Sequence, residues 1–132
     1  MIPVFDGHND ILFRILQAPD KREAINDARA NVAFYSQSPQ YLRYFDGIGM
    51  GDPARALQER FAAGDLAGMV AACTDEMVES IALVGPKDEV LRRFHERVEH
   101  ADACTPVIPH YGLEPDKMAF YSAGIADLFY GN

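Results

Sequence analysis

Apolar side chains recur every three or four residues along much of the chain, which is the spacing of a buried helix face. The first long run is predicted to begin at about Lys21, after an Asp20–Glu23 pair that resembles a capping box, and to end before Ser38-Pro39. Its expected buried stripe is Ile25, Ala28, Val32 and Tyr35, and the side chains expected to face away are Asn26, Asp27, Arg29 and Asn31.

Similar patterns predict further helices towards the C-terminus. A short helix is expected over residues 40–45, and Asp52-Pro53 is typical of an N-cap followed by proline. Residues 66–80 are expected to form two short helices or one bent helix, with Thr74 able to cap the second. Gly85-Pro86 and Glu114-Pro115 begin the last two helices. The buried stripes expected for the three longer helices are Ala54, Leu57 and Phe61; Val90, Leu91, Phe94 and Val98; and Met118, Tyr121, Ile125 and Leu128. The side chains expected to face water after Gly85-Pro86 are Lys87, Asp88, Arg92, Arg93, Glu96 and Arg97.

Strand signals are fewer and shorter. Ile2–Phe5 is typical of a short buried strand, and the apolar run at 11–16 is expected to continue as a helix. Residues 81–85 are expected to be a strand or a helix end. Residues 104–110 are expected to be an edge strand or an extended loop, because Pro106 and Pro109 each lack a backbone donor. About six helices with two or three short strands predict a helix-rich α/β fold.

Composition and charge narrow the function classes. A chain of 132 residues suits one compact domain, or about half of a (β/α)8 barrel. The formal charge of −8 disfavours binding to nucleic acid or to an anionic membrane surface. No apolar run reaches the roughly 18 residues of a membrane span, and no secretory signal is recognisable. Cys73 and Cys104 form no C-x-x-C pair, so we expect a cytoplasmic protein with reduced thiols.

A possible metal site lies near the N-terminus. In a strand, His8 and Asp10 would point to the same side, and imidazole with carboxylate suits zinc. The other interpretation is that Asp10 caps a helix and His8 is half exposed. The letters "VFDGHNDIL" resemble the opening of the membrane dipeptidase family, zinc peptidases built on a (β/α)8 barrel. This resemblance covers about residues 2–19 and implies that His8 and Asp10 are metal ligands. His95, His100 and His110 do not match that family's later motifs, so the metal site is expected to be incomplete.

A longer resemblance covers about residues 24–121. The landmarks, in order, are "AFYSQSPQY" from Ala33, "TDEM" from Thr74 and "LVGPKDEV" from Leu83. They are similar to the C-terminal third of luciferase-like flavin- or F420-dependent oxidoreductases and monooxygenases. That resemblance implies a (β/α)8 barrel that binds FMN or F420 at the carboxyl ends of its strands. Gly85-Pro86 would then offer bare N–H groups to a phosphate, or simply begin a helix. The aromatic residues that would line the flavin ring, or else belong to the core, are Phe34, Tyr35, Tyr41, Tyr44 and Phe45.

Together the two resemblances predict a chain with two origins. Residues 1–22 would be a dipeptidase-like first βα segment and residues 23–132 the C-terminal luciferase-like barrel segment, packed as one compact unit. We expect a truncated or fused remnant of the oxidoreductase, by ancestry a partial (β/α)8 barrel, that is not active alone and retains FMN, F420 or no cofactor. The alternatives are a metallodipeptidase fragment using zinc and a non-catalytic helical interaction module. Exposed sheet edges and apolar helix faces predict homo-oligomers.

Overall fold

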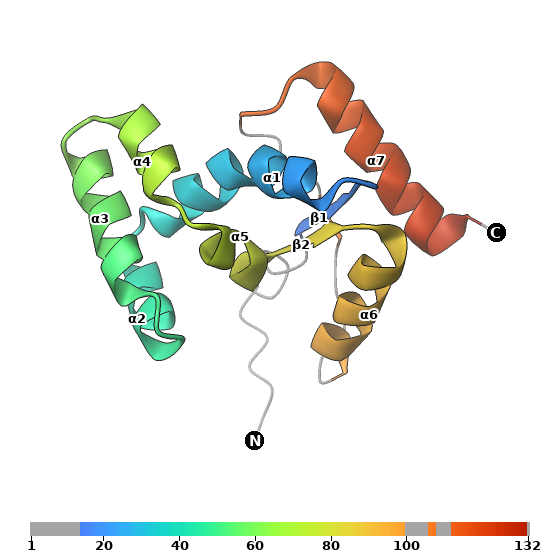
Figure 1. Ribbon diagram of the computed structural model, residues 1–132, viewed down its shortest axis with the longest axis horizontal. Helices are drawn as coiled ribbons and strands as arrows, with labels where there is room; N and C mark the ends of the chain where they lie inside the picture. Colours follow the sequence, from blue (N-terminus) through green and yellow to red (C-terminus); the bar gives the residue numbers. More distant parts are fainter. Residues whose placement is uncertain (1–13, 100–105, 108–111, 132) are drawn as a thin grey trace.

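The computed structural model of the protein describes residues 14–99, 106–107 and 112–131. In this part of the chain the helices and strands are β1 (Arg14–Gln17), α1 (Lys21–Ser36), α2 (Gln40–Gly47), α3 (Gly51–Ala62), α4 (Leu66–Ala72), α5 (Asp75–Ile81), β2 (Ala82–Gly85), α6 (Lys87–Val98) and α7 (Pro115–Tyr130). The predicted fold class, a helix-rich α/β unit with short strands, is confirmed (Figure 1). None of the helices within these ranges is long and apolar enough to cross a membrane.

The two strands pair in parallel, with Ile15 opposite Leu83 and Leu16 opposite Val84. Just beyond the strands, the backbone N–H of Ala18 donates to the carbonyl of Gly85 at 2.9 Å. On the other edge of β1, the Ile15 N–H donates to the carbonyl of Val107 at 3.0 Å. The order across this small sheet is therefore Val107, β1, β2. β1 comes from the predicted first segment and β2 from the second, so the two segments share one sheet.

The helix predicted for residues 11–16 is wrong where it overlaps β1. A short apolar run has no clear period of its own, and here pairing with β2 makes it a strand. The predicted strand at Ile2–Phe5 lies outside the described residues. Of the predicted edge strand at 104–110, Pro106 and Val107 are described, and Val107 forms the bridge to Arg14.

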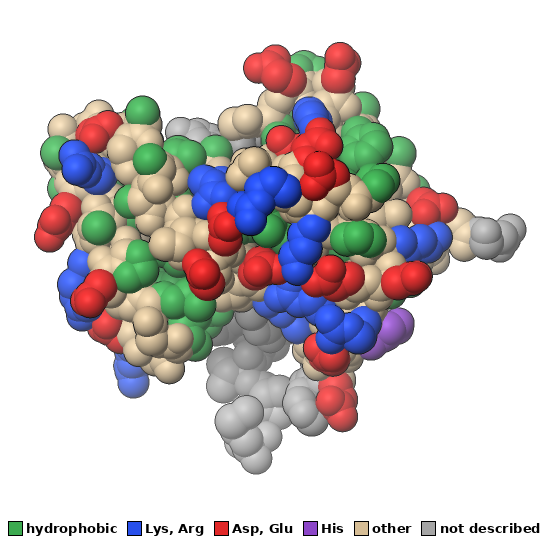
Figure 2. Space-filling model, viewed as in Figure 1, with side chains coloured by type: hydrophobic (Ala, Val, Ile, Leu, Met, Phe, Trp, Pro, Cys, Tyr) green, Lys and Arg blue, Asp and Glu red, His purple; other side chains and the backbone are tan. Residues whose placement is uncertain are grey.

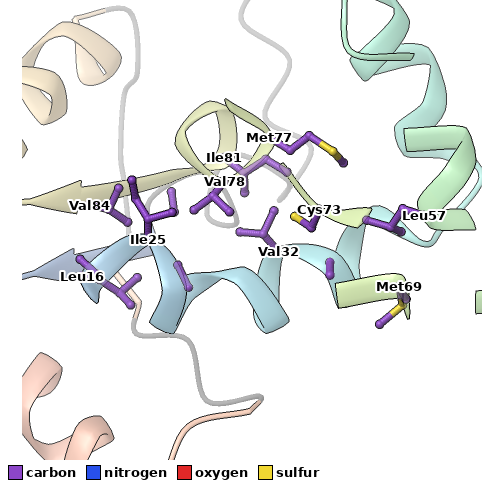
Figure 3. Close-up of a cluster of buried hydrophobic side chains, with 14 of the residues drawn as sticks. Leu16, Ile25, Val32, Leu57, Met69, Cys73, Met77, Val78, Ile81 and Val84 are labelled. Carbon is purple, nitrogen blue, oxygen red and sulfur yellow. The ribbon is translucent and has the colours of Figure 1, made fainter. Parts of the chain in front are cut away.

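Helices cover both faces of the strand pair. Successive strand residues point to opposite faces, so Leu16 and Val84 share one face while Ile15 and Leu83 share the other. The first face belongs to the larger apolar cluster, which runs along α1 from the strands to α3 and α4 (Figure 3). The second face packs against Val90, Phe94 and Leu128, which come from α6 and α7. Figure 1 shows α1 and α6 on opposite sides of the strands.

This two-sided arrangement follows from the order of the connections. From β1 the chain passes through α1 to β2 on one side, and after β2 and α6 it meets the sheet again at Val107, on the other side of β1. Right-handed connections that leave in opposite directions place their helices on opposite faces. In the described part of the chain, both faces of the strand pair are therefore covered by helices.

Local signals placed most helix ends correctly. The Asp20 side chain caps α1 by accepting from the N–H groups of Arg22 at 2.9 Å and Glu23 at 3.4 Å. Residues 66–80 form two helices, α4 and α5, and Thr74 Oγ1 accepts from the Met77 N–H at 3.1 Å, as predicted. Asp52 is not the cap of α3, since the helix begins at Gly51, two residues before the predicted start at Pro53, and Met50 holds the cap position.

Some side chains differ from their predicted exposure. Asn31 is 1% exposed, not solvent-facing, because α1 is contacted by the strands and by α2–α5, so more than one stripe is buried. Phe61, in the last turn of α3, is 38% exposed instead of buried. Arg93 and Arg97 do not simply face water. Both donate to the Glu79 carbonyl, and Arg97 also donates to the carbonyls of Ser80 and Ile81. These bonds satisfy carbonyls that the end of α5 leaves without helical partners.

Candidate functional site

The carboxyl ends of β1 and β2 are the best candidate site because the direction of the connections reverses there. In open α/β sheets, ligands bind outside the carboxyl ends of adjacent strands whose helices lie on opposite faces. Here α1 begins at Lys21 on one face and α6 begins at Lys87 on the other. We call this region the strand-end site; it comprises Gln17, Lys21, Gly85, Lys87, Glu89 and Asp127.

Lys21 joins three helices at the strand-end site. Its Nζ lies 2.7 Å from Glu79 Oε1 of α5 and 2.6 Å from Glu89 Oε1 of α6. Its hydrogen bonds to Glu79 and then to Glu89 raise the pKa of the Lys21 amine, and the hydrogen bond from Lys21 lowers the pKa of the Glu89 carboxyl. At neutral pH this lysine is therefore charged and held by two carboxylates.

Lys87 is held in the same way from the other side. Its Nζ donates to Asp127 Oδ2 of α7 at 2.9 Å, and this bond lowers the pKa of the Asp127 carboxyl, with a smaller contribution from the Gln17 side chain. Gln17 Oε1 is buried and has no hydrogen-bond partner among the residues that the structure describes. α7 approaches Gln17 closely at Gly124, where a Cβ atom would lie 3.5 Å from Gln17 Cβ.

The first turn of α6 already carries its own negative charge. Pro86 occupies the N-cap position and makes no side-chain cap, so the first N–H groups of α6 lack a capping side chain. Asp88 and Glu89 lie in that first turn and interact favourably with the helix dipole. Gly85 has φ of +126°, and a Cβ placed there would lie 3.3 Å from Glu89 Oε2. The Glu89 carboxylate therefore lies close over the turn that a phosphate would approach.

The described residues consequently do not fit the phosphate of a flavin or deazaflavin. A phosphate site needs N–H groups and cations available to the anion. Both lysines at the strand-end site are bound to carboxylates, and the helix start is flanked by two acidic side chains. The prediction that Gly85-Pro86 begins a helix is confirmed, and its phosphate role stays a prediction without support from this geometry.

The residues predicted to bind metal are not tested. His8, Asp10, His100 and His110 lie outside the described residues. His95 is described and is exposed on α6. Within ranges 14–99, 106–107 and 112–131, no group of three or more His, Cys, Asp or Glu side chains is arranged to hold a metal ion. The zinc site at His8 and Asp10 stays a prediction.

All five aromatic residues predicted as a flavin wall make contacts within the fold. Tyr41 packs against the larger cluster, and the Phe34 ring meets the Tyr35 ring edge to face. Phe45 is fully buried in the larger cluster, and the Tyr44 hydroxyl donates to the Ser80 carbonyl at 3.0 Å. The Tyr35 ring lies under the guanidinium of Arg14, with Cζ 4.0 Å from the ring centroid. This cation–π contact stabilises the buried Arg14 guanidinium. These contacts favour the core interpretation of the aromatic residues.

The "TDEM" landmark is also structural in this chain. Thr74 caps α5, and Asp75 accepts from Arg22 at 2.6 Å and from Arg29 at 2.5 Å. Hydrogen bonds from Arg29 and then Arg22 lower the pKa of the Asp75 carboxyl. Arg29 also donates to the Cys73 carbonyl at 2.5 Å. Through Asp75 and Thr74 the landmark thus holds α5 against α1.

A second concave surface lies between α1 and α7. An open cavity of about 330 Å³ is lined by Glu23, Asp116, Lys117 and Phe120. Lys117 pairs with Glu23 and with Asp27, the latter at 3.0 Å, and the Tyr121 hydroxyl donates to Asp27 at 2.5 Å. These contacts join the two helices. Figure 2 shows basic and acidic side chains interspersed over the middle of the visible face, with neither sign dominating.

The sequence interpretation missed Lys21, Glu89 and Asp127 as site residues. The available signal was position, since Lys21 and Lys87 each follow closely after a strand that ends at the same edge of the sheet. Their acidic partners could not be found this way, because Lys21 and Glu89 are 68 residues apart. Only the packing of α1 against α5 and β2 brings them together.

Comparisons with known proteins find partial sequence similarity to a reductase and to uncharacterized proteins. The chain is 30% identical over 102 residues to 5,10-methylenetetrahydromethanopterin reductase of Archaeoglobus fulgidus, which is 74% of this chain and 30% of that protein. It is also 30% identical over 76 residues to uncharacterized proteins of Mycobacterium bovis and Mycobacterium tuberculosis, which is 58% of this chain and 22% of each. The chain thus spans less than a third of these relatives. No family model and no solved structure matches.

Proposed function

We propose that this chain corresponds to the C-terminal part of a luciferase-like flavin- or F420-dependent oxidoreductase and that it does not catalyse a reaction alone. The 30% identity to the Archaeoglobus fulgidus reductase over 102 residues is the observation that carries this proposal. The order of the landmarks "AFYSQSPQY", "TDEM" and "LVGPKDEV" agrees with it. No comparison supports a dipeptidase relationship for the N-terminal residues.

The geometry of the described residues supports the second half of the proposal. A flavin or deazaflavin, when bound, supplies hydride-transfer chemistry, and the protein supplies binding and orientation. This chain's strand-end lysines are already bound to carboxylates, so they do not provide that binding.

Cofactor titration tests whether this chain is inactive alone. The purified chain is titrated with FMN and with F420, and cofactor fluorescence is followed up to high micromolar concentration. We expect no saturable change with either. Saturable binding, or reduction of either cofactor by the chain with an added hydride donor, would show that the chain is competent by itself and would refute inactivity.

The relationship to the reductase has a separate test. A crystal or NMR structure of this chain is superposed on the matching 102 residues of the reductase. We expect β1, α1, β2 and α6 to align with the same order and strand pairing. A different strand order in the reductase would refute the relationship, whatever the cofactor titration shows.

Self-association is a further part of the proposal. Several large apolar side chains are exposed, including Leu66 and Phe120 at 50% and Tyr130 at 85%. Covering such side chains in a dimer would remove apolar area from water. Sedimentation velocity should show a concentration-dependent increase in sedimentation coefficient. A constant monomer value across the accessible concentration range would contradict this expectation.

A further inference from the structure

We infer that Glu89 and Asp127 are specificity-determining residues that exclude phosphate groups from the strand-end site. This inference is that the site does not fit the phosphate of a flavin or deazaflavin. It rests on the proposed function only in its choice of phosphate as the ligand. Its basis is the arrangement of two lysines, their carboxylate partners and the first turn of α6.

The site has the features from which an anion site is usually built. Two helices begin at the carboxyl ends of adjacent parallel strands, α1 at Lys21 and α6 at Lys87. Both first residues are lysines, and Gly85 has a positive φ and no side chain of its own at the turn before α6. Asp20 caps the first N–H groups of α1, whereas α6 has no capping side chain. Without the acidic neighbours of the two lysines, the start of α6 and both cations would attract a phosphate.

Acidic side chains from two helices, α6 and α7, pair with these lysines. Glu89, in the first turn of α6, lies 2.6 Å from Lys21, and Asp127 of α7 lies 2.9 Å from Lys87. Glu89 also lies over the Gly85 turn, within 3.3 Å of the position that a Cβ would take. A phosphate entering here would have to displace two ion pairs and would approach two carboxylates. Like charges at these distances oppose its binding.

The lysines could turn to a phosphate if the carboxylates lost their charge. Lys21 is also paired with Glu79 at 2.7 Å, but Glu79 has Arg93 within 3.7 Å and so keeps a cationic partner if Lys21 moves. Lys87 has Asp127 as its only ion-pair partner within the described residues. Neutralising Asp127 therefore removes the ion-pair partner of Lys87 among the described residues. Neutralising Glu89 removes one of the two carboxylate partners of Lys21 and leaves Glu79.

The test compares phosphate binding by the wild-type chain with binding by the double variant Glu89→Gln and Asp127→Asn. Backbone amide resonances of residues 87–89 are followed by NMR while inorganic phosphate is added, with potassium chloride of equal ionic strength as the blank. We expect no saturable shift in the wild type. In the double variant we expect saturable shifts and an affinity at least about tenfold higher than any wild-type affinity.

A matched variant separates local exclusion from net charge. Asp52→Asn with Glu96→Gln removes the same amount of negative charge at exposed positions away from the strand-end site, where Asp52 and Glu96 lie in α3 and α6. We expect this variant to behave like the wild type. An equal gain in phosphate affinity in both double variants would overturn the inference, because net charge alone would explain it.

Two further results would overturn the inference. One is saturable phosphate binding at residues 87–89 in the wild type, and the other is no gain in the Glu89→Gln, Asp127→Asn variant while its amide spectrum stays dispersed. If that variant unfolds, each single substitution is measured instead, and each is expected to show a smaller gain. None of these results depends on whether the chain binds FMN or F420, so they are distinguishable from failure of the proposed function.

Discussion

Truncating the two central residues of β1 tests whether both faces of the strand pair are covered. Ile15 and Leu16 are adjacent in sequence and both are fully buried, but Leu16 belongs to the cluster around α1 and Ile15 to the cluster of α6 and α7. Replacing a buried Ile or Leu by Ala removes its transfer free energy and leaves a cavity, which costs about 2–5 kcal/mol. We therefore expect both Ile15→Ala and Leu16→Ala to lower the free energy of unfolding by about this amount.

The magnitude leaves the variants measurable, because domains of this size have a free energy of unfolding of about 5–15 kcal/mol. Urea unfolding followed by circular dichroism at 222 nm gives the value, provided the slope with urea is unchanged. Ile15→Val is a milder companion variant, expected to cost about 0.5–1.5 kcal/mol. Leu66→Ala is the control, because Leu66 is 50% exposed and should change the value by about 0.5 kcal/mol or less.

The result that refutes the reasoning is a large difference between the two alanine variants. If helices covered one face of the strand pair and the other face were exposed to solvent, either Ile15 or Leu16 would have few packing contacts. Its replacement would then cost less than about 1 kcal/mol. Equal, small effects of both substitutions would refute the packing of β1 altogether.

Three further predictions concern capping, thiol reactivity and acid sensitivity. Thr74→Ala should lower the free energy of unfolding by about 1 kcal/mol in the same urea assay, and Thr74→Ser should restore most of it, because the hydroxyl caps α5; no loss with alanine would contradict the cap. Burial raises the pKa of the Cys73 thiol to about 12, so in a Cys104→Ser background DTNB at pH 8 should react slowly until urea is added; rapid reaction of the folded chain would contradict this burial. The pKa of Asp75 is lowered in the folded state, so its contribution to stability is complete above its ordinary pKa and is lost as the pH falls through the lowered value. Asp75→Asn should therefore reduce the loss of stability between pH 7 and acid, whereas Asp52→Asn, with a fully exposed side chain, should not; identical pH profiles for wild type and Asp75→Asn would refute the role of this ion pair.

Helices were predictable wherever their ends are set by neighbouring residues. Asp20 starts α1 through hydrogen bonds to N–H groups two and three residues later, and Thr74 starts α5 in the same way. Pro115, in the first turn of α7, has no N–H that the helix would need. Each of these interactions joins residues that are a few positions apart, so it can be predicted from the local sequence.

The strands and the charged site were not predictable in this way. Arg14–Gln17 carries no pattern that separates a strand from a helix, and its partner Ala82–Gly85 lies far along the chain. Arg93 and Arg97 were expected in water because they are charged, yet the end of α5 supplies carbonyls that they satisfy. The candidate site residues His8 and Asp10 remain predictions, since they lie outside the described residues.

By itself, the sequence determined most of the helices, the caps Asp20 and Thr74, the helix-rich α/β class and the similarity to a reductase. Each of these depends on short-range hydrogen bonds, periodicity or residue identity. Only the tertiary structure decided that residues 14–17 form a strand, that helices cover both faces of the strand pair, and that Lys21 and Lys87 are bound to Glu89 and Asp127. The physical reason is distance along the chain. A strand needs a hydrogen-bonding partner, and an ion pair needs an opposite charge, and here both partners come from segments that meet only when the core packs.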